Sequence, residues 1–224
     1  LSGATADTAF LLMLASSRKA FHQHKMIING EWKKDVPSNH LGIELYGKTL
    51  GVFGLGRIGM EMAKRCKGAY DMEIIYHNRS RNEEAEELLD AKKVSFAELL
   101  QQSDVLSVHT ELSEETENKF DKKAFSQMKK SSIFINTSRG GVHNEEDLIA
   151  ALKSETIWGA GLDVTNPEPI DPKSELLNMP SVAVLPHIGS ATVETRDRMI
   201  VLAAENIIAG LNGKKLPHEV KLKS

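Results

Sequence analysis

A glycine-rich turn, Gly54–Gly59 with the sequence G-L-G-R-I-G, restricts the possible folds of this chain more than any other segment. The turn follows a short apolar run, Thr49 to Phe53, and leads into a segment of helical character, Ile58 to Lys67. Strand, glycine turn and helix start are the parts of a dinucleotide-binding turn. A plain glycine-rich turn is the alternative. The flanking pattern favours a nucleotide site, with a pyrophosphate resting on the free N–H groups of the helix N-terminus.

Short β-rich runs alternate with helical stretches along most of the remaining chain. We predict strands at 73–76, 105–109, 133–136, 158–164 and 182–185, and helices at 83–89, from 96 onward, at 122–128, 145–153 and 192–211. Ser95-x-x-Glu98 has the form of a capping box, Asn144 is a fair N-cap, and Asn212-Gly213 is a stop signal. Strands separated by helices imply right-handed crossovers and a parallel sheet covered on both faces. The sequence therefore predicts an α/β fold with a doubly wound parallel sheet of the Rossmann type.

The N-terminal segment differs from the rest, because its predicted helix, Thr8 to Phe21, is apolar around most of its surface. A helix that is apolar on all sides must be buried. Two explanations stay open: the helix packs against a partner subunit, or it lies in the core of a monomer.

Composition narrows the class of protein without identifying a function. The formal net charge of -3 provides no basic surface for nucleic acid. The single cysteine, Cys66, cannot form an internal disulfide, and we expect a buried thiol inside the first helix after the glycine turn. The longest apolar run, Ala9 to Ala15, is too short to span a membrane and has no basic leader. We expect a cytoplasmic protein without a metal site.

Three polar residues follow predicted strands in the second half of the chain: Arg139, Glu168 and His187. In an open parallel sheet, ligands bind outside the carboxyl ends of the strands. Arg139 is suited to hold a substrate carboxylate by paired hydrogen bonds, and His187 to protonate a carbonyl oxygen while Glu168 orients the imidazole. Taken singly, each has a plainer explanation as a surface cation, an exposed turn residue or an incidental histidine. Only the set, next to a nucleotide-binding turn, favours reduction of an α-keto acid.

The chain resembles the D-isomer-specific 2-hydroxyacid dehydrogenases. The resemblance is carried by segments in the family's order over nearly the whole chain: 6–9 (ADTA), the glycine turn, 136–140 (NTSRG), 161–164 (GLDV), 168–169 (EP) and 186–192 (PHIGSAT). Within the family the chain is most similar to the glyoxylate reductase/hydroxypyruvate reductase branch, through 163–169 (DVTNPEP) and 216–220 (LPHEV).

This resemblance implies reduction of glyoxylate or hydroxypyruvate to glycolate or D-glycerate, with Arg139, Glu168 and His187 in the catalytic roles given above. It implies that Asp163 contacts the nicotinamide amide and that the chain is a homodimer. Residues 1–190 are then the dinucleotide-binding domain, with 1–28 as a dimerisation and crossover segment, and 191–224 return toward a substrate-binding domain. The other candidate cofactor-binding residues are Gly54, Gly56, Arg57, Ile58, Gly59, Thr110, Thr116, Thr137, Ser138, Gly189 and Ser190.

The coenzyme can be inferred from the end of the second predicted strand. An NAD site usually has an acid there that binds the ribose 2′-hydroxyl. Between the end of this strand and Glu83 the chain has no acid, and instead carries Asn78, Arg79, Ser80 and Arg81. The arginines can pair with a 2′-phosphate, and Asn78 or Ser80 can donate hydrogen bonds to it. We therefore favour NADP(H), with NAD(H) possible. The alternative is that the arginines are solvated turn residues.

The chain also departs from the family's pattern. Similar proteins are usually longer at the N-terminus, so the second, substrate-binding lobe is expected to be largely absent from this chain. A non-catalytic NAD(P)-binding fragment and a corepressor-like nucleotide-sensing protein are therefore the alternatives to an enzyme. Glu111 and Glu114 stand where relatives often carry proline, and we expect both side chains to face solvent.

Overall fold

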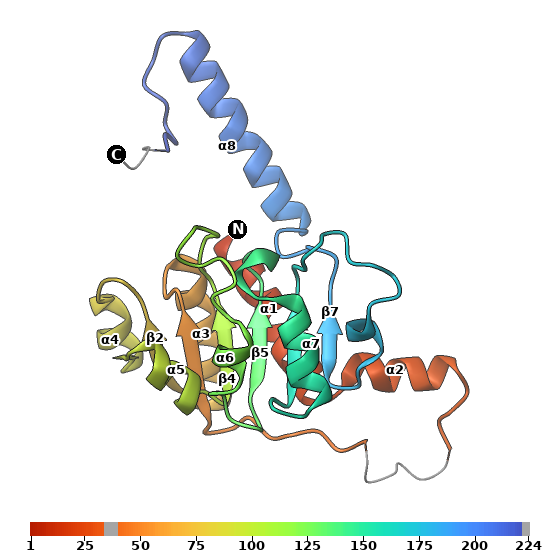
Figure 1. Ribbon diagram of the computed structural model, residues 1–224. Helices are drawn as coiled ribbons and strands as arrows, with labels where there is room; N and C mark the ends of the chain where they lie inside the picture. The colour runs from red at the N-terminus through yellow and green to blue at the C-terminus, as the bar shows by residue number, and fades with distance from the viewer. Residues whose placement is uncertain (34–39, 221–224) are drawn as a thin grey trace. The chain divides into compact units, whose positions relative to one another are not determined.

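The computed structural model describes residues 1–33 and 40–220, which fall into two compact units (Figure 1). The larger unit is Ser2–Gly189. The smaller one consists of Leu1 and the residues from Ser190 onward. The glycine turn and the polar residues that follow the strands all belong to the larger unit.

The larger unit is built on a seven-stranded sheet in the order β3-β2-β1-β4-β5-β6-β7, with every pair of neighbouring strands parallel. Chain order reverses between β1 and β4, which defines a topological switch point. This confirms the predicted doubly wound sheet. The strands are β1 Thr49–Phe53, β2 Glu73–His77, β3 Lys92–Lys93, β4 Val105–Val108, β5 Ile133–Asn136, β6 Gly159–Leu162 and β7 Val182–Val184.

Helices cover both faces of the sheet and enclose two apolar cores (Figure 1). One core contains residues of α1 Ser2–Ser17, α3 Arg57–Tyr70 and α4 Glu83–Leu89, and the other contains residues of α5 Phe96–Gln102, α6 Lys122–Phe125 and α7 Glu145–Lys153. Every residue of β4, β5 and β6 is buried. Burial on both faces is typical of parallel sheets and explains why these strands read as continuous apolar runs.

Side-chain caps set several helix starts where the sequence places them. The Ser95 capping box is present, with both of its reciprocal bonds to Glu98. The Asn144 side chain accepts a hydrogen bond from the Asp147 N–H at 3.0 Å, and α7 begins directly after it. The predicted bounds of α4, α7, β1 and β5 are all confirmed, whereas the two-lysine strand β3 was not predicted.

The prediction for the N-terminal helix was wrong at both ends. Helix α1 already begins at Ser2 and ends at Ser17, and a second helix, α2, covers Ala20–Ile28. Lys19 lies between them with φ 54°, in the left-handed region that a continuous helix cannot contain. No glycine, proline or asparagine marks this break.

Helix α1 approaches the sheet closely because glycines face it on β6. A Cβ on Gly161 would lie 2.8 Å from Leu12 Cβ and 2.7 Å from Ile135 Cδ1. A Cβ on Gly159 would lie 2.4 Å from Ser181 O and 2.7 Å from the Ser16 hydroxyl. The missing side chains therefore make room for the helix to pack on β6.

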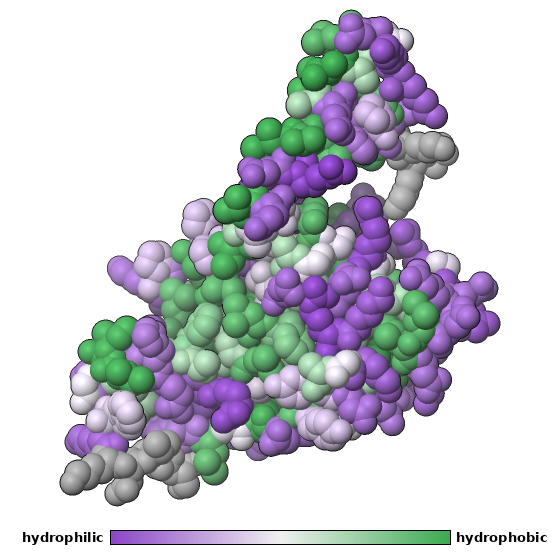
Figure 2. Space-filling model, turned by 180° about the vertical axis from the view of Figure 1, so that it is seen from behind, coloured by the Kyte–Doolittle hydropathy of each residue, from purple (hydrophilic) through white to green (hydrophobic). Residues whose placement is uncertain are grey.

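The outer side of α1 remains partly open. Leu12 and Met13 are fully buried, whereas Leu11 is 49% exposed and Phe10 and Leu14 are only partly buried. Apolar residues gather near the centre of this face of the larger unit in the view from behind (Figure 2). Within this unit α1 is therefore buried on one side only, whereas the sequence predicts burial on all sides.

The smaller unit contains α8, Val193–Leu211, which is capped by Thr192. After Gly213, at φ 65°, the chain turns back along the helix, and the Asn206 side chain both donates to and accepts from the His218 backbone. No residue of α8 is buried. Among residues 1–33 and 40–220, no helix is long and apolar enough to cross a membrane.

The close packing of α1 on β6 leads to a prediction about stability. Gly161→Ala places a methyl group against Leu12 and Ile135, so we expect it to lower the free energy of unfolding by about 1–3 kcal/mol. Gly68→Ala on α3 is the control: nothing lies within 4 Å of its Cβ position, and alanine favours a helix by up to about 1 kcal/mol. Urea unfolding of the two variants and the wild type measures both effects. Equal stability of Gly161→Ala and wild type would show that α1 does not pack as described.

Candidate active site

Glu168 and His187 meet at the carboxyl edge of the sheet. Glu168 follows β6 and His187 follows β7, and these strands are neighbours. His187 Nδ1 lies 2.5 Å from Glu168 Oε1. The two side chains are 47% and 42% exposed, so a ligand can reach them from solvent. With Nδ1 bonded to the carboxylate, the other ring nitrogen of His187, Nε2, is the one available for proton transfer.

The backbone around His187 is held in an unusual conformation by Asp163. His187 has φ 54°, a region in which residues other than glycine are uncommon. The Asp163 carboxylate accepts hydrogen bonds from the Ile188 N–H at 2.8 Å and the Gly189 N–H at 2.7 Å. Asp163 is almost fully buried, and this burial raises the pKa of its carboxyl group, while the two backbone N–H groups act in the opposite direction. A single buried side chain thus fixes the turn that presents the imidazole.

Arg139 lies one strand further along the sheet, after β5, and its side chain is exposed. Its guanidinium Nη1 donates to Ser138 O at 2.6 Å. Within the described residues, no hydrogen bond or ion pair joins Arg139 to Glu168 or His187. Its loop nevertheless touches the loop that leads to Glu168, because a Cβ on Gly140 would lie 1.9 Å from Thr165 O. The structure therefore brings three strand-end loops together, with Glu168 and His187 in direct contact.

The three glycines of the turn have different surroundings. Gly54 has φ 93°, and a Cβ there would lie 2.8 Å from His109 O. A Cβ on Gly59 would lie 2.8 Å from Gly54 O and 3.0 Å from Val52 Cγ1, whereas nothing lies within 4 Å of the Cβ position of Gly56. Gly54 thus serves the tight bend, Gly59 serves the packing of α3, and Gly56 leaves its backbone open to a ligand.

These residues fit a dinucleotide, since the first N–H groups of α3, at Arg57 and Ile58, have no acceptor within the helix.

Two asparagines hold the glycine turn from the side of β2. The Asn78 side chain accepts from the Leu55 N–H at 2.6 Å and donates to Leu55 O at 3.2 Å. The Asn82 side chain donates to the same Leu55 O at 2.9 Å. The Asn78 amide thus holds the Leu55 backbone through one acceptor and one donor, its second N–H is left for a ligand, and its part in phosphate binding stays a prediction.

The two arginines after β2 have different partners. Arg81 forms a two-pronged ion pair with Glu86, and Glu86 also accepts from the Tyr76 hydroxyl at 2.6 Å. Arg81 and Tyr76 lower the pKa of Glu86 to about 2, so its carboxylate is charged at neutral pH. The guanidinium of Arg79 has no ion-pair partner within residues 1–33 and 40–220. Arg79 and Ser80 are exposed, so both can contact a phosphate from solvent.

The remaining candidate cofactor residues have mixed positions. The Thr116 hydroxyl donates to Glu111 O at 2.7 Å and accepts from the Ser113 N–H, so it serves its own turn. Thr110 is partly buried beside Gly54. The Thr137 hydroxyl is buried without a hydrogen-bond partner in the described chain. Ser190 starts the smaller unit, and its part in cofactor binding stays a prediction.

Other expectations from the sequence concern side chains beside the site. Glu111 and Glu114 are both exposed, as expected. Cys66 is buried in α3, and burial raises the pKa of its thiol to about 12, which rules out a reactive thiolate.

Sequence reasoning missed the side chains that hold the strand-end loops. Asn136, the last residue of β5, binds Ser138, Arg139 and His143 through its side-chain amide. Glu145 accepts from the Asn166 N–H at 2.9 Å and so fixes the approach to Glu168. An asparagine at the end of a strand and before a turn is a signal for such a role, since asparagine commonly bonds the backbone two residues on.

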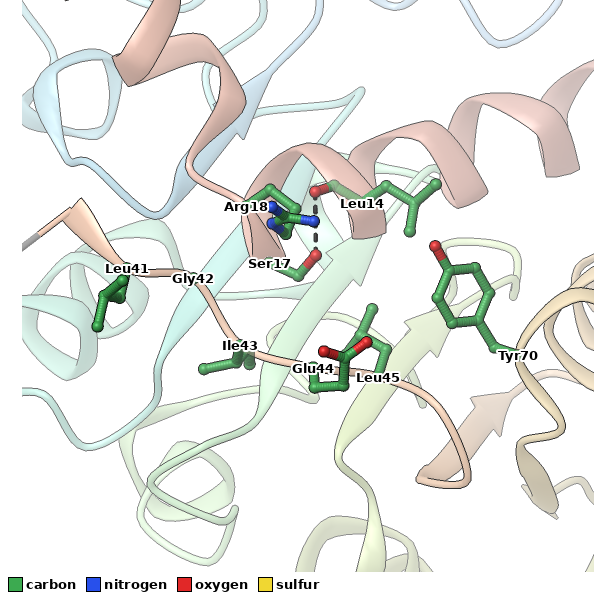
Figure 3. Close-up of a pocket in the computed structure, with 9 residues that line it drawn as sticks. All are labelled: Leu14, Ser17, Arg18, Leu41, Gly42, Ile43, Glu44, Leu45 and Tyr70. Carbon is green, nitrogen blue, oxygen red and sulfur yellow. Dashed lines mark hydrogen bonds between the residues drawn. The ribbon is translucent and has the colours of Figure 1, made fainter. Parts of the chain in front are cut away.

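A cavity of about 270 Å³ lies away from these groups (Figure 3). It is lined by Leu14, Ser17 and Arg18 at the end of α1, by residues 41–45, and by Tyr70. Tyr70 is the last residue of α3, whereas the glycine turn is at the start of that helix. This cavity is therefore not the nucleotide crevice.

Comparison with known proteins gives consistent matches. The sequence model described as D-isomer specific 2-hydroxyacid dehydrogenase, NAD binding domain, matches residues 10–189. Glyoxylate/hydroxypyruvate reductase B of Salmonella gallinarum is 42% identical over 214 residues, which make up 96% of this chain and 66% of that protein. The chain thus spans just under two thirds of the length of this curated relative.

Solved structures agree with this result. The TT0316 protein from Thermus thermophilus has a TM-score of 0.91 at 40% identity, over 99% of this chain and 69% of that one. A glyoxylate reductase from Paecilomyes thermophila has a TM-score of 0.88 at 40% identity, over 98% of this chain and 65% of that one.

The buried histidine beside the Arg139 loop leads to a prediction about pH. Burial lowers the pKa of His143 from 6.5 to about 4. Between these values the unfolded chain binds a proton that the folded chain does not, so the free energy of unfolding falls as the pH falls from about 6.5 to about 4. The contribution of His143 to this fall is up to about 3 kcal/mol. We expect His143→Leu to lose less stability than wild type between pH 7 and pH 4.5 in urea unfolding, and identical losses would contradict the burial of a neutral imidazole.

Proposed function

The chain belongs to the D-isomer specific 2-hydroxyacid dehydrogenase family, and on that premise we propose that it is the coenzyme-binding part of an NAD(P)-dependent reductase. We propose that this enzyme reduces glyoxylate or hydroxypyruvate to glycolate or D-glycerate. One observation carries the proposal: the 2.5 Å contact between His187 and Glu168 at the carboxyl edge of the sheet that also carries the open glycine turn. Such a pair next to a dinucleotide site is suited to proton transfer during carbonyl reduction.

His187 is the proton donor in this proposal. When bound, the reduced coenzyme supplies a hydride to the carbonyl carbon. The His187 Nε2–H gives a proton to the carbonyl oxygen, and the imidazole regains its proton from solvent. Glu168 holds Nδ1 and thereby keeps Nε2 aimed at the substrate. The Asp163 carboxylate keeps the turn in place while the proton moves.

Arg139 binds the substrate carboxylate. Its guanidinium is exposed and, among the residues that the structure describes, donates one hydrogen bond, to Ser138 O, so other N–H donors remain for a ligand. A guanidinium can bind a carboxylate through two parallel hydrogen bonds, which fixes the orientation of a small keto acid. The contact of Gly140 with Thr165 supports placing this cation beside the Glu168 loop.

We favour NADP(H) as the coenzyme, with NAD(H) as a second possibility. No acid stands directly after β2, and Asn78 is engaged with Leu55. Arg79 is exposed and unpaired within the described residues, whereas Arg81 is neutralised by Glu86. Arg79 is therefore the principal partner we assign to a 2′-phosphate. The Arg81 side chain is itself 68% exposed, so we keep it as a second candidate partner of the phosphate.

We propose a homodimer in which the outer face of α1 is covered by a second copy. Leu11 is half exposed on this face, and Leu14 lines both the face and the adjacent cavity. A cytoplasmic location fits the single buried cysteine.

The exposed apolar residues of α8 are the surface that we assign to a substrate-binding lobe. They include Met199, Ile200, Ile207 and Ile208. An amphipathic helix without buried residues is typical of an element that packs on another domain. In this proposal the smaller unit packs against the substrate-binding lobe, which is the part of the relatives that the chain does not match.

Turnover with a nicotinamide coenzyme tests the proposed reaction. The chain, and a version extended upstream to the length of its relatives, are mixed with NADPH and glyoxylate or hydroxypyruvate while nicotinamide absorbance is followed. We expect turnover in the extended version, and a loss of about 100-fold or more in His187→Asn because the proton donor is removed. His24→Asn, which changes an exposed histidine on α2, is the control. Tight NADPH binding without turnover in either version would indicate a nucleotide-binding protein and contradict the proposed enzymatic activity.

Coenzyme preference tests the assignment of Arg79. We expect Arg79→Ala to shift the ratio of kcat/KM for NADPH over NADH toward NADH by about tenfold or more, because a charge-assisted contact with the 2′-phosphate is lost. Arg81→Ala should shift the ratio less, since Glu86 already pairs with Arg81. An unchanged ratio in Arg79→Ala would refute this account of the phosphate.

A further inference from the structure

We propose that His143 is a positioning residue for Arg139, acting through the side chain of Asn136. Neither residue was assigned a role in binding or catalysis from the sequence. The proposal rests on the proposed function, in which Arg139 binds the substrate carboxylate. Two buried side chains, Asn136 on β5 and His143 in the following loop, then determine where the guanidinium of Arg139 lies.

The Asn136 amide uses all of its hydrogen-bonding capacity inside the loop that carries Arg139. Its Nδ2 donates to Arg139 O at 3.0 Å and to His143 Nδ1 at 3.0 Å. Its Oδ1 accepts from the Ser138 N–H at 2.9 Å and from the Ser138 hydroxyl at 2.8 Å. A carboxamide has two donors and two acceptor positions, so each of them is filled. Asn136 is fully buried, which makes any lost bond expensive.

The orientation of this amide determines the path of the loop. If the amide turned over, its oxygen would face the Arg139 carbonyl oxygen and its NH₂ group would face the Ser138 N–H. Both of these contacts would be repulsive. The observed orientation therefore fixes the backbone on either side of Arg139, from Ser138 to the Arg139 carbonyl.

His143 supports this orientation by accepting the second N–H of the amide. Burial lowers the pKa of the imidazole and keeps it neutral. The Ser138 N–H and the Arg139 carbonyl oxygen fix which end of the amide is the NH₂ group, and this group faces His143 Nδ1, so Nδ1 accepts and the ring proton is on Nε2. The ring is itself held in place: the His143 N–H donates to Gly140 O at 3.2 Å, and the ring lies edge-on to Phe134 with centroids 5.7 Å apart. Nε2 has no hydrogen-bond partner in the described chain, so Nδ1 carries the only polar contact of this side chain.

The same asparagine connects the Arg139 loop to the groups around His187. Asn136 O accepts from the Asp163 N–H at 3.0 Å, and Asp163 in turn holds the turn after His187. Gly140, next to Arg139, lies against Thr165 in the loop that leads to Glu168. A shift of the Arg139 loop would therefore change the position of the cation relative to the Glu168–His187 pair. In this way His143 contributes to the distance between the carboxylate-binding group and the proton donor.

Two variants of similar size separate the hydrogen bond from the volume of the side chain. His143→Leu removes the acceptor, whereas His143→Gln keeps an oxygen that can accept from Asn136. In the version extended upstream, we expect His143→Leu to raise KM for glyoxylate by about tenfold. The KM for NADPH should stay within about twofold of the wild-type value. His143→Gln should restore most of the affinity for glyoxylate. Equal effects of the two variants, or a parallel change in both KM values, would overturn the proposal.

Hydrogen exchange tests the same contact without turnover. The Ser138 N–H donates to Asn136, so in the chain itself we expect it to exchange about tenfold faster in His143→Leu than in wild type, and to stay close to wild type in His143→Gln. Unchanged exchange at Ser138 in His143→Leu would show that His143 does not order the loop. If wild type has no turnover but exchange responds as expected, the proposed function fails while the support of the loop by His143 stands.

Discussion

The site depends on one buried carboxylate, that of Asp163. It follows β6, and its two oxygens accept the N–H groups of Ile188 and Gly189 after the neighbouring strand β7. These bonds hold His187 in a left-handed conformation that its own backbone preference disfavours. Conformations of this kind persist only where surrounding structure determines them, and here the surrounding structure places the imidazole against Glu168. Without Asp163 the strands would still form, but the turn would lose the bonds that direct His187 toward its partner.

Much of the fold follows from local patterns. The glycine turn, the caps at Ser95 and Asn144, and the buried apolar strands each act over a few residues, so the sequence predicts them closely. The parallel topology then brings the ends of β5, β6 and β7 to one edge. For that reason Glu168 and His187 could be paired from the sequence although 19 residues separate them.

The interactions that the sequence did not predict arise between groups that only folding brings together. Asn78 binds the Leu55 backbone across 23 residues, and Arg81 pairs with Glu86. The left-handed Lys19 is another case, since no residue type around it signals a break in the helix. In each case the outcome depends on which group lies nearby after folding. Composition and periodicity carry no information about that choice.

In our proposal Arg139, Glu168 and His187 converge on one bound nicotinamide ring. A crystal structure of the protein with NADPH and oxalate, a non-reducible carboxylate, tests this convergence. We expect the pyrophosphate over Gly56, the nicotinamide C4 facing His187 Nε2, and an oxalate carboxylate paired with the Arg139 guanidinium. A nicotinamide bound away from His187, or oxalate with no contact to Arg139, would contradict it.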